Sequence, residues 1–295
     1  MSAGLPIVVD RLGKSFGPVH AVSDLSFEVR PGRVTGFLGP NGAGKTTTLR
    51  MLLGLVRPST GSALIGGRSY GDLDDPARTV GASLEAAFHP GRTGRGHLET
   101  VALGAGIPRS AIPDVLRHVG MAEYADRRVG GYSLGMRQRL GLAGALLGDP
   151  GVLVLDEPAN GLDPEGIRWM RTRLRELAAE GRTVLLSSHL LAEVQQTVDD
   201  VIVIAGGRLR YAGLAAPEGA ATRVDAPDRE ALAAALRASG FEAVDGADGL
   251  LVRGAVPAEV GRIALAAGVA LSALAPHSAG LEDDFLALIG EEDAP

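Results

Sequence analysis

The segment Gly39–Thr46 holds the residue types that bind phosphate groups. It has the form G-x-x-x-x-G-K-T, follows the apolar run Val34–Leu38, and precedes a helical pattern that starts at Thr47. Glycines let several backbone N–H groups converge on one anion, and the helix that follows adds the positive end of its dipole. The pattern therefore predicts an ATP site in which Lys45 contacts the β- and γ-phosphates and Thr46 holds Mg²⁺. The other loop residues expected to bind the nucleotide are Asn41, Gly42, Ala43, Gly44 and Thr47.

Lysine is rare in this chain, and its position supports the assignment. Of the 29 basic residues only Lys14 and Lys45 are lysine. An arginine-rich chain that keeps a lysine inside a glycine-rich loop fits a requirement for a compact ammonium group. From the composition, a chance occurrence of the motif is on the order of a few in a thousand. The alternative is a flexible surface turn that binds nothing.

Two adjacent carboxylates, Asp156 and Glu157, follow the apolar run Val152–Leu155. Such a run is typical of a strand buried on both faces of a parallel sheet, and open α/β sheets bind ligands at the carboxyl ends of their strands. We expect Asp156 to hold Mg²⁺ and Glu157 to be the general base for the attacking water. Successive side chains of a strand point to opposite sides, so the two residues need separate roles. The alternative, an acidic pair that caps the next helix, leaves the loop Pro158–Pro164 unexplained.

Two further residues are candidates for nucleotide contacts. His189 follows a third apolar strand, Thr183–Leu186, and its place at the same sheet edge favours a contact with the γ-phosphate. A histidine at a strand end is otherwise usually structural. Phe16 lies ahead of the phosphate loop and could stack on adenine. A loop phenylalanine packed on the core is the alternative, and taken alone that alternative is favoured.

These groups can meet only if parallel strands bring their carboxyl ends to one sheet edge. Apolar and alternating patterns predict strands on both sides of the phosphate loop and a hairpin around Gly206-Gly207. Residues 86–147 interrupt this rhythm with helical patterns after a loop at Gly91–Gly96, which indicates a helical insert within an α/β domain. The expected strands are Ile7–Val9, Ala21–Val29, Val34–Leu38, Ala63–Ile65, Thr79–Leu84, Val152–Leu155, Thr183–Leu186, Asp200–Ala205 and Arg208–Ala212.

Charge and composition divide the chain into two parts. The formal net charge is −6, but residues 213–295 hold 5 Arg and 14 Asp or Glu, a charge of −9. The first 212 residues therefore carry +3. This step coincides with the Gly/Ala/Pro-rich stretch Gly213–Ala221, so we expect one domain at 1–212 and a second at 213–295.

The same composition excludes several classes of protein. The chain has no cysteine, which excludes disulfides and thiolate metal sites. No apolar run approaches the roughly 20 residues of a membrane span, and the first residues lack the charged-then-apolar pattern of a secretory signal. We therefore expect a cytoplasmic protein that does not cross a membrane by itself. No basic surface with interleaved aromatic residues is evident, so no nucleic-acid partner is expected.

With these motifs in order, residues 5–212 resemble the ATP-binding subunits of ABC transporters. The resemblance implies the P-loop NTPase fold of an ABC ATPase, a mixed sheet with a helical subdomain at about 86–147. It implies ATP and Mg²⁺ as cofactors, with His189 as the switch histidine and Phe16 stacked on adenine. It also implies a homodimer, in which Ser133 and Gly135 contact the γ-phosphate held by the partner subunit and Asp163 lies in the loop that crosses the dimer.

Two departures from the family pattern narrow the resemblance. The usual L-S-G-G-Q signature is Tyr132–Met136 here, with one glycine and the glutamine replaced, and Glu85 stands where a glutamine that binds the nucleotide and its metal is usual. Both features are similar to the branch that exports drugs and peptide antibiotics such as daunorubicin and bacitracin. That branch implies a separate transmembrane permease, with this chain peripheral on the inner face of the cell membrane. We further expect Gly91–His97 to receive a helix of the permease. The alternative is a soluble ABC ATPase that acts on nucleic acid or ribosomes.

The tail has its own pattern of elements. From residue 222 to 275 the order is β-α-β-β-α-β, which suggests a small ferredoxin-like α+β domain. The apolar residues Leu281, Phe285, Leu288 and Ile289 then have the spacing of one helix face. Similar tails in the drug-export branch imply a dimerising or regulatory role.

Overall fold

The computed structural model describes residues 3–84, 88–189, 196–214, 221–246 and 249–277. These residues form two compact units, one before and one after the segment 215–220. The expected boundary after residue 212 falls inside a strand that continues to Leu214, because residues 213 and 214 still pair with the core sheet. The first unit is therefore two residues longer than the sequence indicated.

The core of the first unit is a six-stranded sheet in the order β5-β6-β7-β3-β8-β9. The five strands from β5 to β8 are parallel, and only β9 runs antiparallel, as the second strand of the predicted hairpin. The carboxyl ends of β3, β6 and β7 consequently meet at one edge. The bounds are β3 Val34–Leu38, β5 Val80–Ser83, β6 Val152–Leu155, β7 Thr183–Ser188, β8 Asp200–Ala205 and β9 Arg208–Leu214.

A second, antiparallel sheet has the order β2-β1-β4, with β1 at Ile7–Phe16, β2 at Val19–Val29 and β4 at Thr60–Ile65. Helix α1, Lys45–Leu52, makes contacts with β2 and β4 of this sheet. One apolar core joins the two sheets and this helix, and it includes Phe37, Leu49 and Ile65. The phosphate loop thus runs from a buried strand into a buried helix.

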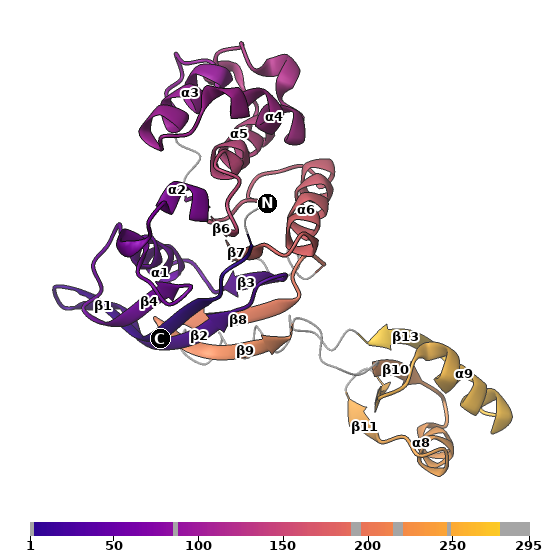
Figure 1. Ribbon diagram of the computed structural model, residues 1–295. Helices are drawn as coiled ribbons and strands as arrows, with labels where there is room; N and C mark the ends of the chain where they lie inside the picture. Colours follow the sequence, from indigo (N-terminus) through magenta and orange to yellow (C-terminus); the bar gives the residue numbers. More distant parts are fainter. Residues whose placement is uncertain (1–2, 85–87, 190–195, 215–220, 247–248, 278–295) are drawn as a thin grey trace. The chain divides into compact units, whose positions relative to one another are not determined.

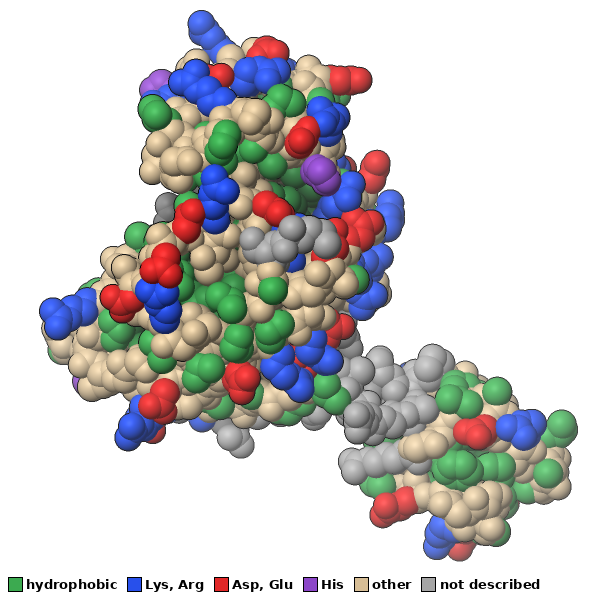
Figure 2. Space-filling view, viewed as in Figure 1, with side chains coloured by type: hydrophobic (Ala, Val, Ile, Leu, Met, Phe, Trp, Pro, Cys, Tyr) green, Lys and Arg blue, Asp and Glu red, His purple; other side chains and the backbone are tan. Residues whose placement is uncertain are grey.

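The predicted helical insert forms a separate layer, drawn at the top of Figure 1. It contains α3 Gly94–Gly104, α4 Ile112–His118 and α5 Leu134–Leu146, with 3₁₀ turns between them. The predicted loop at Gly91–Gly96 is wrong in its second half, because Thr93 caps α3 by accepting a hydrogen bond from Gly96 N at 3.0 Å. Figure 2 shows basic side chains on the surface of this layer, with acidic and histidine side chains among them. The basic ones are all Arg, because the insert contains no lysine. The other α-helices among the described residues of this unit are α2 Pro76–Thr79 and α6 Pro164–Ala179.

The second unit has the predicted β-α-β-β-α-β order. Its sheet is β11-β12-β10-β13, all pairs are antiparallel, and α8 and α9 enclose a core that includes Leu232, Val252 and Val260. The ferredoxin-like prediction is therefore confirmed. The helix expected at Leu281–Ile289 lies outside the described residues. The bounds are β10 Ala221–Asp225, α8 Arg229–Ala238, β11 Ala243–Gly246, β12 Gly249–Arg253, α9 Pro257–Ala266 and β13 Ala273–His277. None of the described helices combines the length and apolar content needed to span a membrane.

Candidate nucleotide-binding site

The phosphate loop turns between β3 and α1 on glycines that no other residue can replace without strain. Gly42 and Gly44 have φ values of 83° and 101°, a region that L side chains rarely adopt. A Cβ at Gly44 would also lie 2.5 Å from Ala21 O. A cavity of about 240 Å³ opens on the loop. It is lined by Ala21, Pro40, Asn41, Gly42, Gly44, Lys45, Thr46, Thr47 and Glu157.

Lys45 is almost fully buried, with 6% of its side chain exposed, and its ammonium group lies within the loop. Its Nζ donates hydrogen bonds to Gly39 O at 2.6 Å and to Pro40 O at 3.3 Å. The same atom lies 3.5 Å from Glu157 Oε1. A positive charge is thus held at the start of α1, where the helix dipole also favours an anion.

Thr46 and Asp156 are hydrogen-bonded to each other, although 110 positions of sequence separate them. The Thr46 hydroxyl donates to Asp156 Oδ2 at 2.7 Å, and the Ser187 hydroxyl donates to the other carboxylate oxygen. These are hard oxygen donors of the kind that Mg²⁺ prefers. No group of three or more Asp, Glu or His side chains suited to a metal occurs among the described residues. One carboxylate and one hydroxyl fit an ion that takes its other ligands from phosphates and water.

Glu157 has an unusual backbone conformation for a residue other than glycine, with φ at 49°. Because β6 ends at Leu155, the expected alternation of Asp156 and Glu157 across a strand is wrong. The positive φ instead turns Glu157 so that its Oε2 lies 2.9 Å from His189 Nδ1 while Oε1 faces Lys45. A carboxylate only accepts, so His189 donates from Nδ1. The structure therefore brings five predicted residues together, Lys45, Thr46, Asp156, Glu157 and His189.

Other predicted residues lie apart from this group. Phe16 is half exposed at the end of β1, does not line the cavity, and has Lys14 Nζ 4.9 Å from its ring centre. Its contact with adenine stays a prediction. Glu85 lies outside the described residues, so its role in binding nucleotide or metal also stays a prediction.

The three residues predicted to act across a dimer sit at two helix N-termini. Ser133 is exposed and caps α5 by accepting from Met136 N at 3.2 Å. Asp163 is exposed and caps α6 by accepting from Gly166 N at 2.7 Å. Gly135 lies between them, and a Cβ there would lie 3.5 Å from a Leu162 methyl carbon. None of the three lines the cavity at Lys45, and their contact with the nucleotide of a second copy stays a prediction.

Sequence reasoning did not identify Ser187 as a site residue. Its side chain is fully buried and contacts both Asp156 and the backbone of Glu157. The sequence held a signal for it, since Ser187 follows the predicted strand Thr183–Leu186 directly. A hydroxyl at the carboxyl end of a parallel strand lies beside the residue that ends the neighbouring strand.

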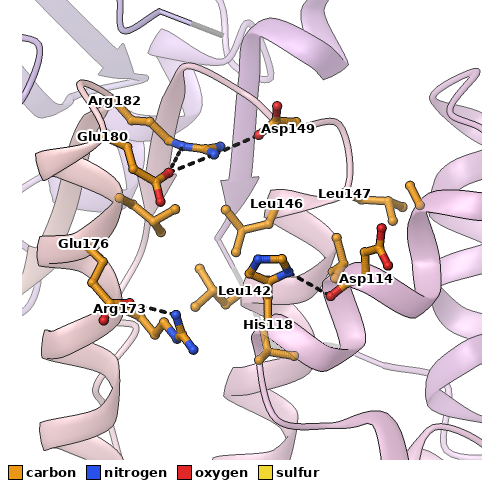
Figure 3. A pocket seen from close by; sticks show the side chains of 14 residues that line it. Asp114, His118, Leu142, Leu146, Leu147, Asp149, Arg173, Glu176, Glu180 and Arg182 are labelled. Atoms are coloured by element: carbon orange, nitrogen blue, oxygen red, sulfur yellow. Dashed lines mark hydrogen bonds and ion pairs between the residues drawn. The ribbon is translucent and has the colours of Figure 1, made fainter. Parts of the chain in front are cut away.

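A larger cavity of about 300 Å³ lies between α4, α5 and α6 (Figure 3) and is separate from the cavity at the phosphate loop. Its floor is apolar, with Leu142, Leu146 and Leu177, and it includes none of the predicted phosphate-binding residues. Its charged rim is internally paired, Arg173 with Glu176 at 2.7 Å and Arg182 with Asp149 and Glu180 at 2.8 and 3.1 Å.

Comparisons with known proteins agree with the geometry at the phosphate loop. The family model described as ABC transporter matches residues 22–160, and a domain of unknown function, DUF8746, matches residues 220–282. The solved structure of an ATP-binding subunit of an ABC transporter matches with a TM-score of 0.63 at 26% identity. That match covers 79% of this chain and 93% of the other.

Three curated relatives each match about two thirds of this chain. The bacitracin transport ATP-binding protein BcrA of Bacillus licheniformis is 45% identical over 202 residues, which is 67% of this chain and 66% of that protein. The lantibiotic transport ATP-binding protein SrtF of Streptococcus pyogenes is 35% identical over 68% of this chain and 87% of that protein. The Nod factor export ATP-binding protein I of Burkholderia pseudomallei is 42% identical over 69% of each.

The matches cover only part of some relatives, and this limits what can be inferred about this chain from them. The chain spans slightly less than two thirds of the length of the first curated relatives it matches, 66% and 63%. It covers most of the lantibiotic transport protein, at an identity well above the level at which only a fold is shared. The chain therefore belongs to the ATP-binding proteins of ABC transporters, a family of ATPases.

Proposed function

We propose that this chain binds and hydrolyses ATP to power an ABC exporter, and that it acts on the inner face of the cell membrane through a separate permease. The observation that carries the hydrolytic part is the position of Glu157. One of its oxygens is 2.9 Å from His189 Nδ1 and the other is 3.5 Å from Lys45 Nζ. A carboxylate held beside the phosphate-binding lysine is placed to accept a proton from a water that attacks the γ-phosphate.

Five side chains share the proposed chemistry. Lys45 exchanges its carbonyl partners for β- and γ-phosphate oxygens and stabilises their charge. Glu157 takes the proton of the attacking water, and His189 holds Glu157 in place and contacts the γ-phosphate. Thr46 and Asp156 would hold Mg²⁺, which would supply positive charge to stabilise the phosphate groups during their transfer. The oxygen donors of Thr46 and Asp156, 2.7 Å apart, support this assignment.

Dimerisation completes the proposed site. Ser133 and Gly135 of one copy would contact the γ-phosphate that Lys45 of the other copy holds, and Asp163 would lie in the loop that crosses between them. The exposure of Ser133 at the N-terminus of α5 supports the phosphate contact, because a helix start favours an anion. Asp163 is also exposed, which leaves it accessible to a second copy.

The proposed cargo is a drug, an antibiotic or a lipid-like molecule. The support is the printed names of relatives, which concern bacitracin, a lantibiotic and a Nod factor. A role on nucleic acid or ribosomes is less well supported, because these relatives are transport or export proteins. Isolation of the chain from native membranes with a multispanning protein would support the export role; isolation with ribosomes would contradict it.

Glu157→Gln tests the hydrolytic part, since the amide keeps the shape but accepts no proton. We expect hydrolysis to fall by about 10²- to 10⁴-fold and the protein to accumulate as an ATP-bound dimer on size-exclusion chromatography. Glu230→Gln, on the exposed first turn of α8 in the second unit, is the matched control and should behave as wild type. A Glu157→Gln protein that hydrolyses ATP at the wild-type rate would contradict the assignment.

A further inference from the structure

We propose that Ser187 is a positioning residue, which fixes the backbone of the general base Glu157 to the carboxylate of Asp156. The inference rests on the proposed ATP hydrolysis. Ser187 lies on β7, the strand between β6 and β3, so it is next to both the carboxylates and the strand that leads into the phosphate loop. Its exposed fraction is 0%.

One hydroxyl makes two hydrogen bonds of opposite sense. The Ser187 hydroxyl accepts a hydrogen bond from Glu157 N at 2.9 Å and donates its proton to Asp156 Oδ1. These directions are fixed, because a backbone N–H only donates and a carboxylate only accepts. A methyl group can do neither, so Ser187→Ala leaves both partners without this bond in a buried place.

The register of the sheet explains how Ser187 reaches both partners. Leu186 of β7 pairs with Leu155, the last residue of β6, so Ser187 lies beside the first two residues after that strand. Asp156 N is bonded on the other side to Ser83 O of β5 at 2.8 Å. The turn that carries Asp156 and Glu157 is therefore held from both neighbouring strands, and Ser187 supplies the contact from β7.

The conformation of Glu157 makes this contact important. Its φ of 49° is one that residues with a side chain adopt only when their surroundings hold them there. The bond from Glu157 N to Ser187 is an anchor on the backbone itself, in addition to the side-chain contacts with His189 and Lys45. We infer that without it the Glu157 carboxylate moves away from the attacking water while the phosphate loop is unchanged.

Ser187→Ala should therefore lower kcat more than it changes KM. A displacement on the scale of 1 Å can reduce a rate by roughly 10²-fold, so we expect a loss of about 10- to 100-fold in kcat. The KM for ATP should stay within about threefold, because Lys45 and the phosphate loop keep their contacts and Asp156 keeps the hydrogen bond from the Thr46 hydroxyl. The matched control is Thr35→Val on β3, which deletes a hydroxyl that is equally buried in the same sheet and should leave kcat unchanged.

A pair of variants at the same position separates the hydroxyl from packing. Ser187→Thr and Ser187→Val give side chains of the same branched shape and similar size, but only the threonine keeps the hydroxyl. We expect Ser187→Thr to retain at least ten times the kcat of Ser187→Val, even if Ser187→Ala folds poorly. Equal kcat values for the two variants, both folded by circular dichroism, would overturn the proposal.

The double variant tests whether Ser187 acts through Glu157. In single-turnover assays, Ser187→Ala in the Glu157→Gln background should reduce the residual rate by no more than about twofold, since its target is already lost. If Ser187→Ala lowers the residual rate of Glu157→Gln by the full factor of about 10 to 100, Ser187 does not act through Glu157 and the proposal is overturned. Wild-type protein that does not hydrolyse ATP would instead refute the proposed function, and wild-type activity with an unaffected Ser187→Ala would refute only this inference.

Discussion

His189 Nδ1 lies 2.9 Å from Glu157 Oε2, although 32 positions of sequence separate the two residues. Both side chains are partly exposed toward the phosphate loop, at 29% and 23%. The pair holds one oxygen of the carboxylate, while the other oxygen is shared with Lys45. The proposed base is thus held at both oxygens and has a defined orientation before substrate arrives, which is what preorganised catalysis needs.

Removing the histidine should therefore affect turnover more than binding. We expect His189→Ala to lower kcat about 10²-fold, because Glu157 loses the contact that orients it and the γ-phosphate loses a partner. The affinity for a fluorescent ATP analogue should change by no more than about threefold. His118→Ala, an exposed histidine on α4 bonded to Asp114 O, is the control. Unchanged turnover in His189→Ala would contradict the assigned role.

Substitutions of Lys45 and of Asp156 should distinguish the contribution of phosphate binding from that of metal binding. Lys45→Ala should abolish tight ATP binding at any Mg²⁺ concentration, because the phosphates lose the ammonium group that stabilises their charge and Mg²⁺ binds elsewhere. Asp156→Asn should weaken binding in a way that higher Mg²⁺ partly restores, since one neutral oxygen still coordinates the ion. Titration of nucleotide binding at several Mg²⁺ concentrations distinguishes the two. The metal assignment fails if Asp156→Asn responds to Mg²⁺ as Lys45→Ala does.

Much of this site could be predicted because its signals are local. The phosphate loop is one continuous segment, and the rule that parallel strands end at one edge was enough to gather Lys45, Asp156 and His189. The conformation of Glu157 could not be predicted, because nothing local indicates that β6 ends at Leu155 and that the backbone then turns to a positive φ. The role of Ser187 depends on the strand register, which becomes certain only in the folded sheet.

For the fold, too, features with a local sequence signal could be predicted and others could not. Buried apolar runs predicted the core strands well, whereas the start of α3 was missed because Thr93 caps a helix that begins with the helix-weakening residues Gly94 and Gly96. Arg95 was expected to be a docking residue, but it lies on that helix and pairs with Asp126 at 2.7 Å. Its substitution would disturb the insert itself, so Arg92 is the better test of contact with the permease.

The helical insert should lose stability on mild acidification through His97. Burial, and secondarily the nearby Arg92 charge, lower the pKa of His97, whose ring packs edge-on against Phe88 at 4.8 Å. The unfolded chain then binds a proton more readily than the folded chain, so stability falls as pH drops below about 6.5, the ordinary histidine value. His97→Gln should have a flatter dependence of unfolding free energy on pH between 7 and 5. An equally steep dependence in the variant would contradict this cause.

The boundary between the two units can be tested with two truncated proteins that end at different residues. A protein ending at Leu214 keeps every pair of β9 with β8, whereas one ending at Ala212 loses the pairs of Gly213 with Val201 and Leu214 with Asp200. We expect the longer protein to bind ATP within about threefold of the full chain, because no described residue of the second unit lines the cavity at Lys45.

The shorter protein should be less stable by about 1 kcal/mol for each ladder hydrogen bond lost, measured by urea unfolding. The loss falls beside Asp200, which is buried under Arg33 at 2.6 Å and Arg30 at 3.0 Å, so the start of β8 should loosen first. Amide exchange at Val201 would show this directly. If the protein ending at Leu214 folds but no longer binds ATP, the tail contributes to the nucleotide site. If the two truncated proteins are equally stable, the boundary lies at residue 212.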